Sequence, residues 1–128
     1  MNALVIRTDF SDEAAWERLC RALRTPSPDF GFLANVDFVN DRRHDGATAE
    51  ALVAEAPDSQ MLLFVADRVA LTHPEQPVLA VYYFDTPFRS IRVIPSELWG
   101  VENNISLANM DFEEFAENVG PDGIFRGF

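Results

Sequence analysis

Two patterns of apolar residues alternate along the first half of the chain. Nearly continuous apolar runs at residues 3–8 and 61–66 predict buried strands, and residues 35–40 predict another strand. Between them, apolar residues spaced three and four positions apart predict short amphipathic helices, one capped by Ser11 and another beginning near Thr48. Since strands that alternate with helices are joined by right-handed crossovers, we expect a parallel sheet at the core.

The second half of the chain predicts a β-hairpin and further helical structure. Residues 78–84 are apolar on both faces, which favours a central strand, and residues 89–94 alternate, which favours an outer strand. Ser96 is expected to begin a short helical turn that Gly100 ends. The predicted fold is one α/β domain over residues 1–128, with a mixed sheet of about five strands (βαβαβ, then a β-hairpin, then α) and about three helices.

The stretch at residues 95–120 has the most specific pattern in the sequence. It contains six carboxylates between Glu97 and Glu117, and no arginine interrupts them. Asp111 and Glu114 are spaced as a capping box, which predicts the start of a helix. Apolar side chains then follow at helical spacing as far as Val119, so this helix is expected to bury one face before Gly120 ends it.

The charge of the chain limits what it binds. The 128 residues contain 21 acids and 10 arginines, for a formal charge of −11, and both halves of the chain are acidic. An acidic protein repels nucleic acid and anionic membranes, so we expect it to bind neither. The sequence contains no lysine, which excludes a Schiff-base lysine and the lysine of a phosphate-binding loop.

Cysteine usage and hydropathy indicate the compartment. Cys20 is the single cysteine, which excludes an internal disulfide, a redox cysteine pair and a multi-cysteine zinc site. No apolar run reaches the length of a membrane span, and the N-terminus lacks a signal-peptide pattern. We therefore expect a cytoplasmic protein in which Cys20 is a small buried apolar residue.

Two blocks of sequence resemble a known family. RTDFSDEAAW near the N-terminus and PSELWGVENNISLANMDFEEFAENVGPDGIFRGF at the C-terminus are similar to a family of small acidic proteins from high-GC bacteria, described as a domain of unknown function. The resemblance covers nearly the whole chain. It implies a single cytoplasmic domain and brings no assigned reaction, substrate or catalytic residue.

Three aspartates suggest one candidate site. Asp9, Asp41 and Asp67 each follow a predicted parallel strand, and open α/β sheets bind ligands beyond those strand ends. Three converging carboxylates would hold a hard cation such as Mg²⁺ or Ca²⁺. The alternative is that each aspartate caps a helix or forms a turn on its own, which is a frequent role for this residue.

A second candidate site lies in the WGVENN motif. Trp99, Glu102, Asn103 and Asn104 combine an indole, a carboxylate and two amides, groups that bind a polar small molecule or a partner. The alternative is ordinary loop architecture, with the asparagines in left-handed turn positions.

The absence of a complete catalytic motif favours binding over catalysis. We hypothesise a non-enzymatic acidic module, similar to immunity or adaptor proteins, that engages a basic protein partner without a cofactor. The expected contact residues are Trp99, Glu102, Asn103, Asn104, Asp111, Glu113 and Glu114. The alternative hypothesis is a small metal-assisted enzyme or ligand sensor that uses Mg²⁺ or Ca²⁺ at the three aspartates. The protein is expected to be a monomer, or a homodimer that buries the tail aromatics Phe125 and Phe128.

Overall fold

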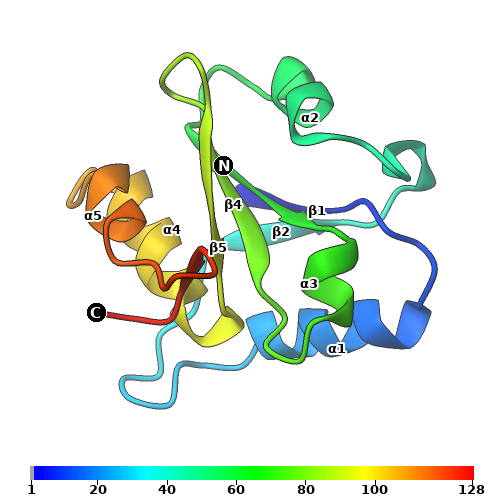
Figure 1. Ribbon diagram of the computed structural model, residues 1–128, viewed down its shortest axis with the longest axis horizontal. Helices are drawn as coiled ribbons and strands as arrows, with labels where there is room; N and C mark the ends of the chain where they lie inside the picture. Colours follow the sequence, from blue (N-terminus) through cyan, green and yellow to red (C-terminus); the bar gives the residue numbers. More distant parts are fainter. Residues whose placement is uncertain (1) are drawn as a thin grey trace.

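Six strands form one mixed sheet in the order β2-β1-β3-β4-β5-β6 (Figure 1). The structure is a computed structural model, and it describes residues 2–128. The strands are β1 (Ala3–Arg7), β2 (Val36–Val39), β3 (Leu62–Ala66), β4 (Val78–Tyr82), β5 (Arg89–Val93) and β6 (Ile124–Phe125). Strands β2, β1 and β3 are parallel, β4 is antiparallel to both of its neighbours, and β6 is parallel to β5. The predicted α/β class, the parallel core and the hairpin are confirmed.

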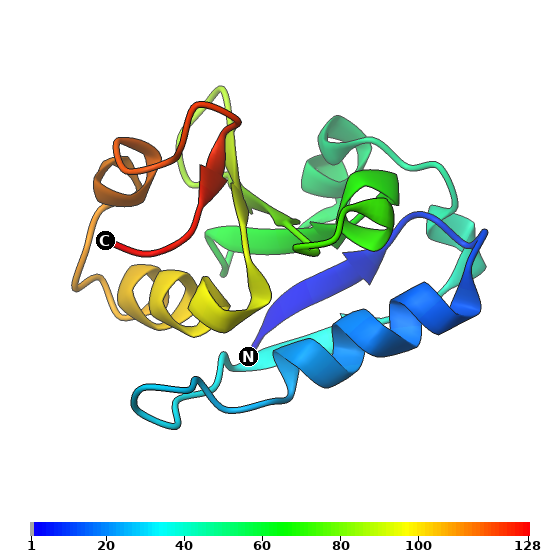
Figure 2. The same ribbon diagram turned by 60° about the horizontal axis from the view of Figure 1, so that its bottom comes forward.

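Five helices cover the two faces of the sheet (Figures 1 and 2). They are α1 (Glu13–Leu23), α2 (Ala49–Glu55), α3 (Arg68–Thr72), α4 (Leu98–Ser106) and α5 (Phe112–Ala116). The chain leaves β1 in one direction to reach β2 and then crosses back past β1 to reach β3. Because parallel crossovers are right-handed, the helices of these two connections lie on opposite faces, with α1 on one and α2 on the other.

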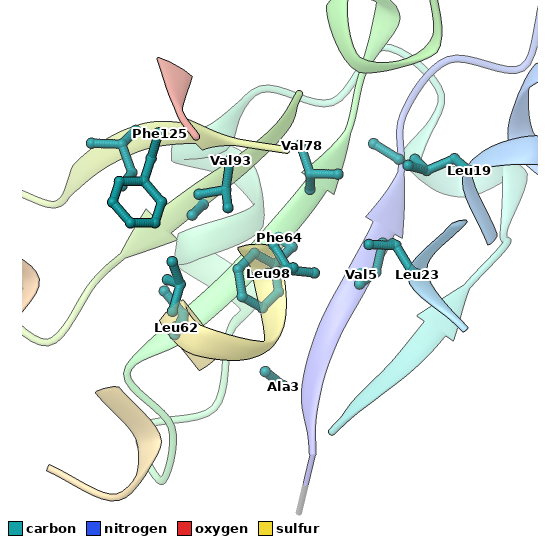
Figure 3. Close-up of a cluster of buried hydrophobic side chains, with 14 of the residues drawn as sticks. Ala3, Val5, Leu19, Leu23, Leu62, Phe64, Val78, Val93, Leu98 and Phe125 are labelled. Atoms are coloured by element: carbon teal, nitrogen blue, oxygen red, sulfur yellow. The ribbon is translucent and has the colours of Figure 1, made fainter. Parts of the chain in front are cut away.

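The larger hydrophobic core lies between the sheet and helices α1, α4 and α5 (Figure 3). Phe64 in the centre of β3 is fully buried, and so are Leu19 of α1 and Leu98 of α4. A smaller cluster on the other face joins Ile6, Leu63, Val65 and Val81 to Leu52 of α2. Cys20 belongs to the larger core, as its helical spacing predicts.

The N-cap of helix α1 is Asp12, one residue later than the predicted cap. The prediction that Ser11 caps this helix is wrong, because the side chain of Asp12 accepts the N–H of Ala15 at 3.1 Å. The Ser11 N–H donates instead to the carboxylate of Asp9 at 2.9 Å, so Ser11 lies in a turn before the helix. Aspartate and serine cap helices equally well, and their order here follows from the turn that Asp9 forms.

The C-terminal half differs more from the prediction. Helix α4 does not end at Gly100 and instead runs on to Ser106, so the WGVENN motif is helical. The two-residue strand β6 pairs with β5, which therefore has a neighbour on each side. Helix α5 has the predicted capping box between Asp111 and Glu114 and ends at Ala116, three residues early.

Candidate functional site: an acidic and aromatic face

A buried carboxylate ties helix α4 to the loop between α1 and β2. Glu102 is only 4% exposed, and its Oε1 accepts the backbone N–H of Asn35 at 2.6 Å. Its Oε2 accepts the hydroxyl of Ser106 at 2.8 Å. Both oxygens of this desolvated carboxylate thus have a donor, as burial of a charge requires. Glu102 therefore positions the loop, and its burial contradicts the expectation that it contacts a partner.

The two asparagines of the motif bind backbone carbonyls. Asn103 Nδ2 donates to the carbonyl of Trp99 at 2.7 Å and to that of Leu33 at 3.3 Å. Asn104 Nδ2 donates to the carbonyl of Gly100 at 2.8 Å. Both residues lie in α4, so the interpretation of left-handed turn positions is wrong. Their amides hold the helix and the loop together.

The same loop presents an exposed group of aromatic side chains. Phe30 and Phe32 are 69% and 50% exposed, and their rings stack with centroids 5.8 Å apart. The Phe32 ring also packs against the half-buried indole of Trp99, at 4.8 Å between centroids. Leu33 follows at 44% exposed. Exposed aromatic clusters of this kind are typical of protein-binding surfaces.

Internal hydrogen bonds fix the conformation of the loop that carries these rings. The buried Ser27 donates its N–H to the carbonyl of Phe32 at 2.8 Å, and its hydroxyl accepts the N–H of Phe32 at 3.0 Å. Gly31, whose φ of +72° favours glycine, donates its N–H to the carbonyl of Ser27 at 2.9 Å. A loop closed in this way loses little further conformational freedom when it binds a partner.

Two stretches of the chain next to the aromatic group are acidic and contain no arginine. No arginine lies between Arg24 and Arg42 or between Arg92 and Arg126, and these stretches contain ten of the 21 acids. Residues 44–67 also lack arginine and contain five further acids, so the acidity is not confined to these two stretches. The fold brings the two stretches together through the contacts of α4 with the loop, and they lie on the same side in Figures 1 and 2. Acidic stretches thus adjoin the exposed aromatic group, and we call this surface the acidic and aromatic face.

Glu97, two residues before Trp99, and Asp29, which precedes Phe30, are near enough for their charges to interact. The pKa of Glu97 is raised above its usual value, first because the carboxyl is partly buried and then because Asp29 repels its charge. A cation placed here would relieve the repulsion between the two groups.

The other predicted contact residues surround the start of α5. Asp111, Glu113 and Glu114 are all exposed. Glu114 Oε2 accepts the N–H of Asp111 at 2.8 Å within the capping box, and Glu113 forms an ion pair with Arg89. Asp111 and Glu114 thus stabilise the helix end while their charges stay at the surface, and Arg89 compensates Glu113.

The three strand-end aspartates each have a separate local partner. Asp9 accepts the N–H of Ser11, and Asp41 accepts the N–H of Arg43 at 3.0 Å. The pKa of Asp9 is lowered, first by hydrogen bonds from Ser11. Asp67 caps α3 and forms a two-pronged ion pair with Arg92, with both N···O distances at 2.7 Å. Within residues 2–128 no three His, Cys, Asp or Glu side chains are grouped to hold a metal, so the structure does not assemble the predicted cation site.

Of the two C-terminal aromatics, one is buried in the core and the other is exposed. Phe125 is 1% exposed and belongs to the core, with its ring 5.3 Å from that of Phe115. Phe128 is 76% exposed, and its ring lies 5.1 Å from that of Phe125. The expectation that Phe125 is available to bury against a second copy is therefore wrong.

The local sequence does contain a signal for the exposed aromatic group, but it lies outside the predicted strands and helices. Phe30 and Phe32 occupy the loop TPSPDFGFLAN, where prolines and a glycine prevent a strand or helix. Large apolar side chains in a segment that cannot enter the sheet are expected at the surface. Their contact with Trp99 depends on the fold and has no counterpart in the local sequence.

No helix within residues 2–128 is long and apolar enough to cross a membrane. Comparison with known proteins places the chain in a family: it belongs to a domain of unknown function (DUF6924), whose pattern matches residues 2–128. A search of curated proteins found no match.

Proposed function

We propose that the protein is a non-enzymatic binding module that engages a basic protein partner through its acidic and aromatic face. The observation that supports this proposal is the coincidence of the two properties on one face. The two arginine-free stretches meet where Phe30, Phe32 and Trp99 form a stacked and partly exposed group.

A basic partner fits this face because arginine and lysine side chains combine a cation with an apolar stem. The stem packs on aromatic rings, and the cation interacts with the ring faces and with nearby carboxylates. Asp29 precedes Phe30 and Glu97 lies two residues before Trp99, and their charges repel each other, so a cation bound there would be stabilised by both. The negative field would also accelerate association, and added salt would slow it.

The rigid loop supports the same proposal. Interface residues that contribute most to affinity are usually aromatic side chains held in place before binding. Phe32 is fixed by two hydrogen bonds to Ser27 and by its contact with Trp99. We also propose that the module acts in the cytoplasm, where its free cysteine would stay reduced.

The experiment that tests this function is affinity capture from a lysate of the source organism at low salt. The bait is the intact protein, and elution at high salt releases partners held by charge. A basic protein is expected in the eluate, and its affinity is then measured with the purified pair by titration. Trp99 serves as a reporter, because Trp16, the other tryptophan, is 4% exposed.

Two variants distinguish binding through this face from nonspecific hydrophobic binding elsewhere on the surface. Replacing Phe30 and Phe32 by serine is expected to weaken binding at least tenfold, as loss of central aromatic contacts does. The matched control is Phe84→Ser, since Phe84 is 67% exposed in the turn between β4 and β5. Retention of no basic protein at low salt, or equal loss of binding in both variants, would contradict the proposal.

A further inference from the structure

A second surface feature lies on the opposite face of the sheet, beneath α2. A recess of about 150 Å³ separates this helix from the strands. Its floor is apolar and consists of Leu4, Ile6, Val39 and Leu63 from the sheet, and Leu52 of α2 closes it from above. Apolar recesses with a few polar groups at the rim are the usual form of small-molecule sites.

The recess follows from the composition of α2. This helix has seven residues, AEALVAE, and Leu52 is its one buried residue. The neighbouring Ala56, which caps the helix, also lines the recess. Alanine side chains are too short to fill the space between a helix and a sheet of leucine, isoleucine and valine. The larger core on the other face has the bulkier Trp16, Phe112 and Phe115 at its helices.

One buried polar side chain at the recess has an uncommitted donor. His44 is 7% exposed, and its Nε2 accepts a hydrogen bond from Arg43 Nε at 3.3 Å. With Nε2 as the acceptor, the ring proton is on Nδ1, which has no hydrogen-bond partner within residues 2–128. No fully buried side-chain nitrogen or oxygen in these residues lacks a partner, so Nδ1 is accessible to solvent or to a ligand. Two other polar groups of the lining are already used: Tyr83 donates to the carbonyl of Pro57, and Gln60 donates to that of Asn2.

The charges at the recess oppose each other. Arg43 and Glu55 both line it, and Arg43 is also 3.4 Å from the carboxylate of Asp41. An anion would be attracted by Arg43 and repelled by Glu55 and Asp41. A cation would be repelled by Arg43 and attracted by the two acids. This balance favours a ligand without charge.

We propose that the recess binds a small, uncharged and mainly apolar molecule with one hydrogen-bond acceptor, such as an aromatic ketone, and that His44 Nδ1 donates to this acceptor. A cavity of this volume holds a benzene ring. The ligand therefore has about six to nine non-hydrogen atoms inside the recess. This site is separate from the acidic and aromatic face and does not depend on its function.

Four probes of one shape test the proposal with the intact wild-type protein. Acetophenone has the ring and the acceptor, ethylbenzene lacks the acceptor, benzoate adds a negative charge, and benzylamine adds a positive charge. Binding is measured by NMR, from the shifts of the methyl groups of Leu52, Leu63 and Ile6. Acetophenone is expected to bind with a Kd of about 1 mM, as ligands of this size do. The other three probes are expected to bind about threefold to tenfold more weakly, because each lacks one favourable feature.

Two further variants assign the contacts. His44→Phe keeps the ring and removes the donor, so acetophenone and ethylbenzene should then bind within about twofold of each other. Ala56→Leu fills the recess and is expected to abolish binding of all probes. Its control is Ala54→Leu, the same change at an exposed position of α2 outside the recess, which should leave binding unchanged.

Several results would overturn the assignment. These are no methyl shifts with any probe, tighter binding of benzoate or benzylamine than of acetophenone, and probe-induced shifts confined to Phe30, Phe32 and Trp99. If Ala56→Leu does not fold, the comparison of wild type with His44→Phe still decides the role of the donor. A His44→Phe variant that keeps the full preference for acetophenone would rule out that role.

Discussion

The carboxylate of Glu102 accepts the backbone N–H of Asn35 at 2.6 Å, across a separation of 67 residues. Asn35 directly precedes β2, the strand at one edge of the sheet, and Glu102 lies in the middle of α4. The contact fixes the end of the aromatic loop and the start of the edge strand at the same time. A buried carboxylate of α4 therefore helps to determine how Phe30 and Phe32 are presented.

Removing this carboxylate is expected to destabilise the protein. Glu102→Ala leaves the Asn35 N–H and the Ser106 hydroxyl without an acceptor in a buried position. Hydrogen bonds to charged groups contribute about 1.5–3 kcal/mol, so the free energy of unfolding should fall by about 2–3 kcal/mol in urea denaturation. Glu50→Ala, an exposed position of α2, should change it by less than about 0.5 kcal/mol. Equal effects would show that the buried carboxylate has no special role.

Two glycine-to-alanine changes are expected to act in opposite directions. Gly100 lies within α4, and a Cβ added there meets no atom within 4 Å. Gly100→Ala should therefore raise the free energy of unfolding by about 0.5–1 kcal/mol through helix propensity. Gly31 has a φ of +72° in the aromatic loop, and Gly31→Ala should lower it by about 1–2 kcal/mol through backbone strain alone. Thermal unfolding of both variants beside wild type measures the difference, and a shift of the same sign would refute it.

The apolar pattern predicts the fold more accurately than the site. Runs such as residues 61–66 are buried on both faces, so their hydrophobicity alone identifies strands that need cover on each side. Gly100 is by itself a signal for a helix end. In the structure, however, the Asn104 amide donates to the Gly100 carbonyl, and Leu98 and Val101 pack in the core, so the helix continues past Gly100.

The charge distribution shows a different limit. Counts by halves of the chain indicate evenly spread acidity. The arginines from Arg7 to Arg43 partly offset the acids of the first half, and those from Arg68 to Arg126 partly offset the acids of the second. The fold brings two of the stretches without arginine together through the contacts of α4 with the aromatic loop. The partner of each aspartate at a strand end likewise depends on the fold, since Asp67 pairs with Arg92 from a strand two places away in the sheet.

The raised pKa of Glu97 predicts how stability changes with pH. Between the usual glutamate pKa and this raised value, the folded protein binds more protons than the unfolded chain, so stability falls as the pH rises through that window. The cost of the charged carboxylate is then fully present at neutral pH. Glu97→Gln should therefore be more stable than wild type at about pH 7, and this advantage should disappear at about pH 4.

Urea denaturation at the two pH values measures this difference. Asp29→Asn provides the matched control, because it removes the second cause of the raised pKa and leaves the burial of Glu97 unchanged. In that background the gain from Glu97→Gln should be smaller. A gain of the same size at both pH values would mean that packing, and not charge, sets the effect.

The three strand-end aspartates predict the response to divalent cations. Asp67 already accepts two hydrogen bonds from Arg92, and Asp9 and Asp41 bind backbone N–H groups of their own turns. Removing cations with EDTA and restoring millimolar Mg²⁺ or Ca²⁺ should leave the melting temperature unchanged. An ion present at 100 times its Kd would add about 2.7 kcal/mol, which raises the melting temperature by several degrees in a domain of this size.

Asp67→Asn distinguishes an ion pair from a metal ligand. The change removes the charge that faces Arg92, whose side chain is 20% exposed, so the variant should lose about 1–3 kcal/mol of stability. This loss should be the same with and without the cation. A cation-dependent rise in the wild-type melting temperature that Asp67→Asn or Asp9→Asn abolishes would instead establish the carboxylate site, with Arg92 released when the ion binds.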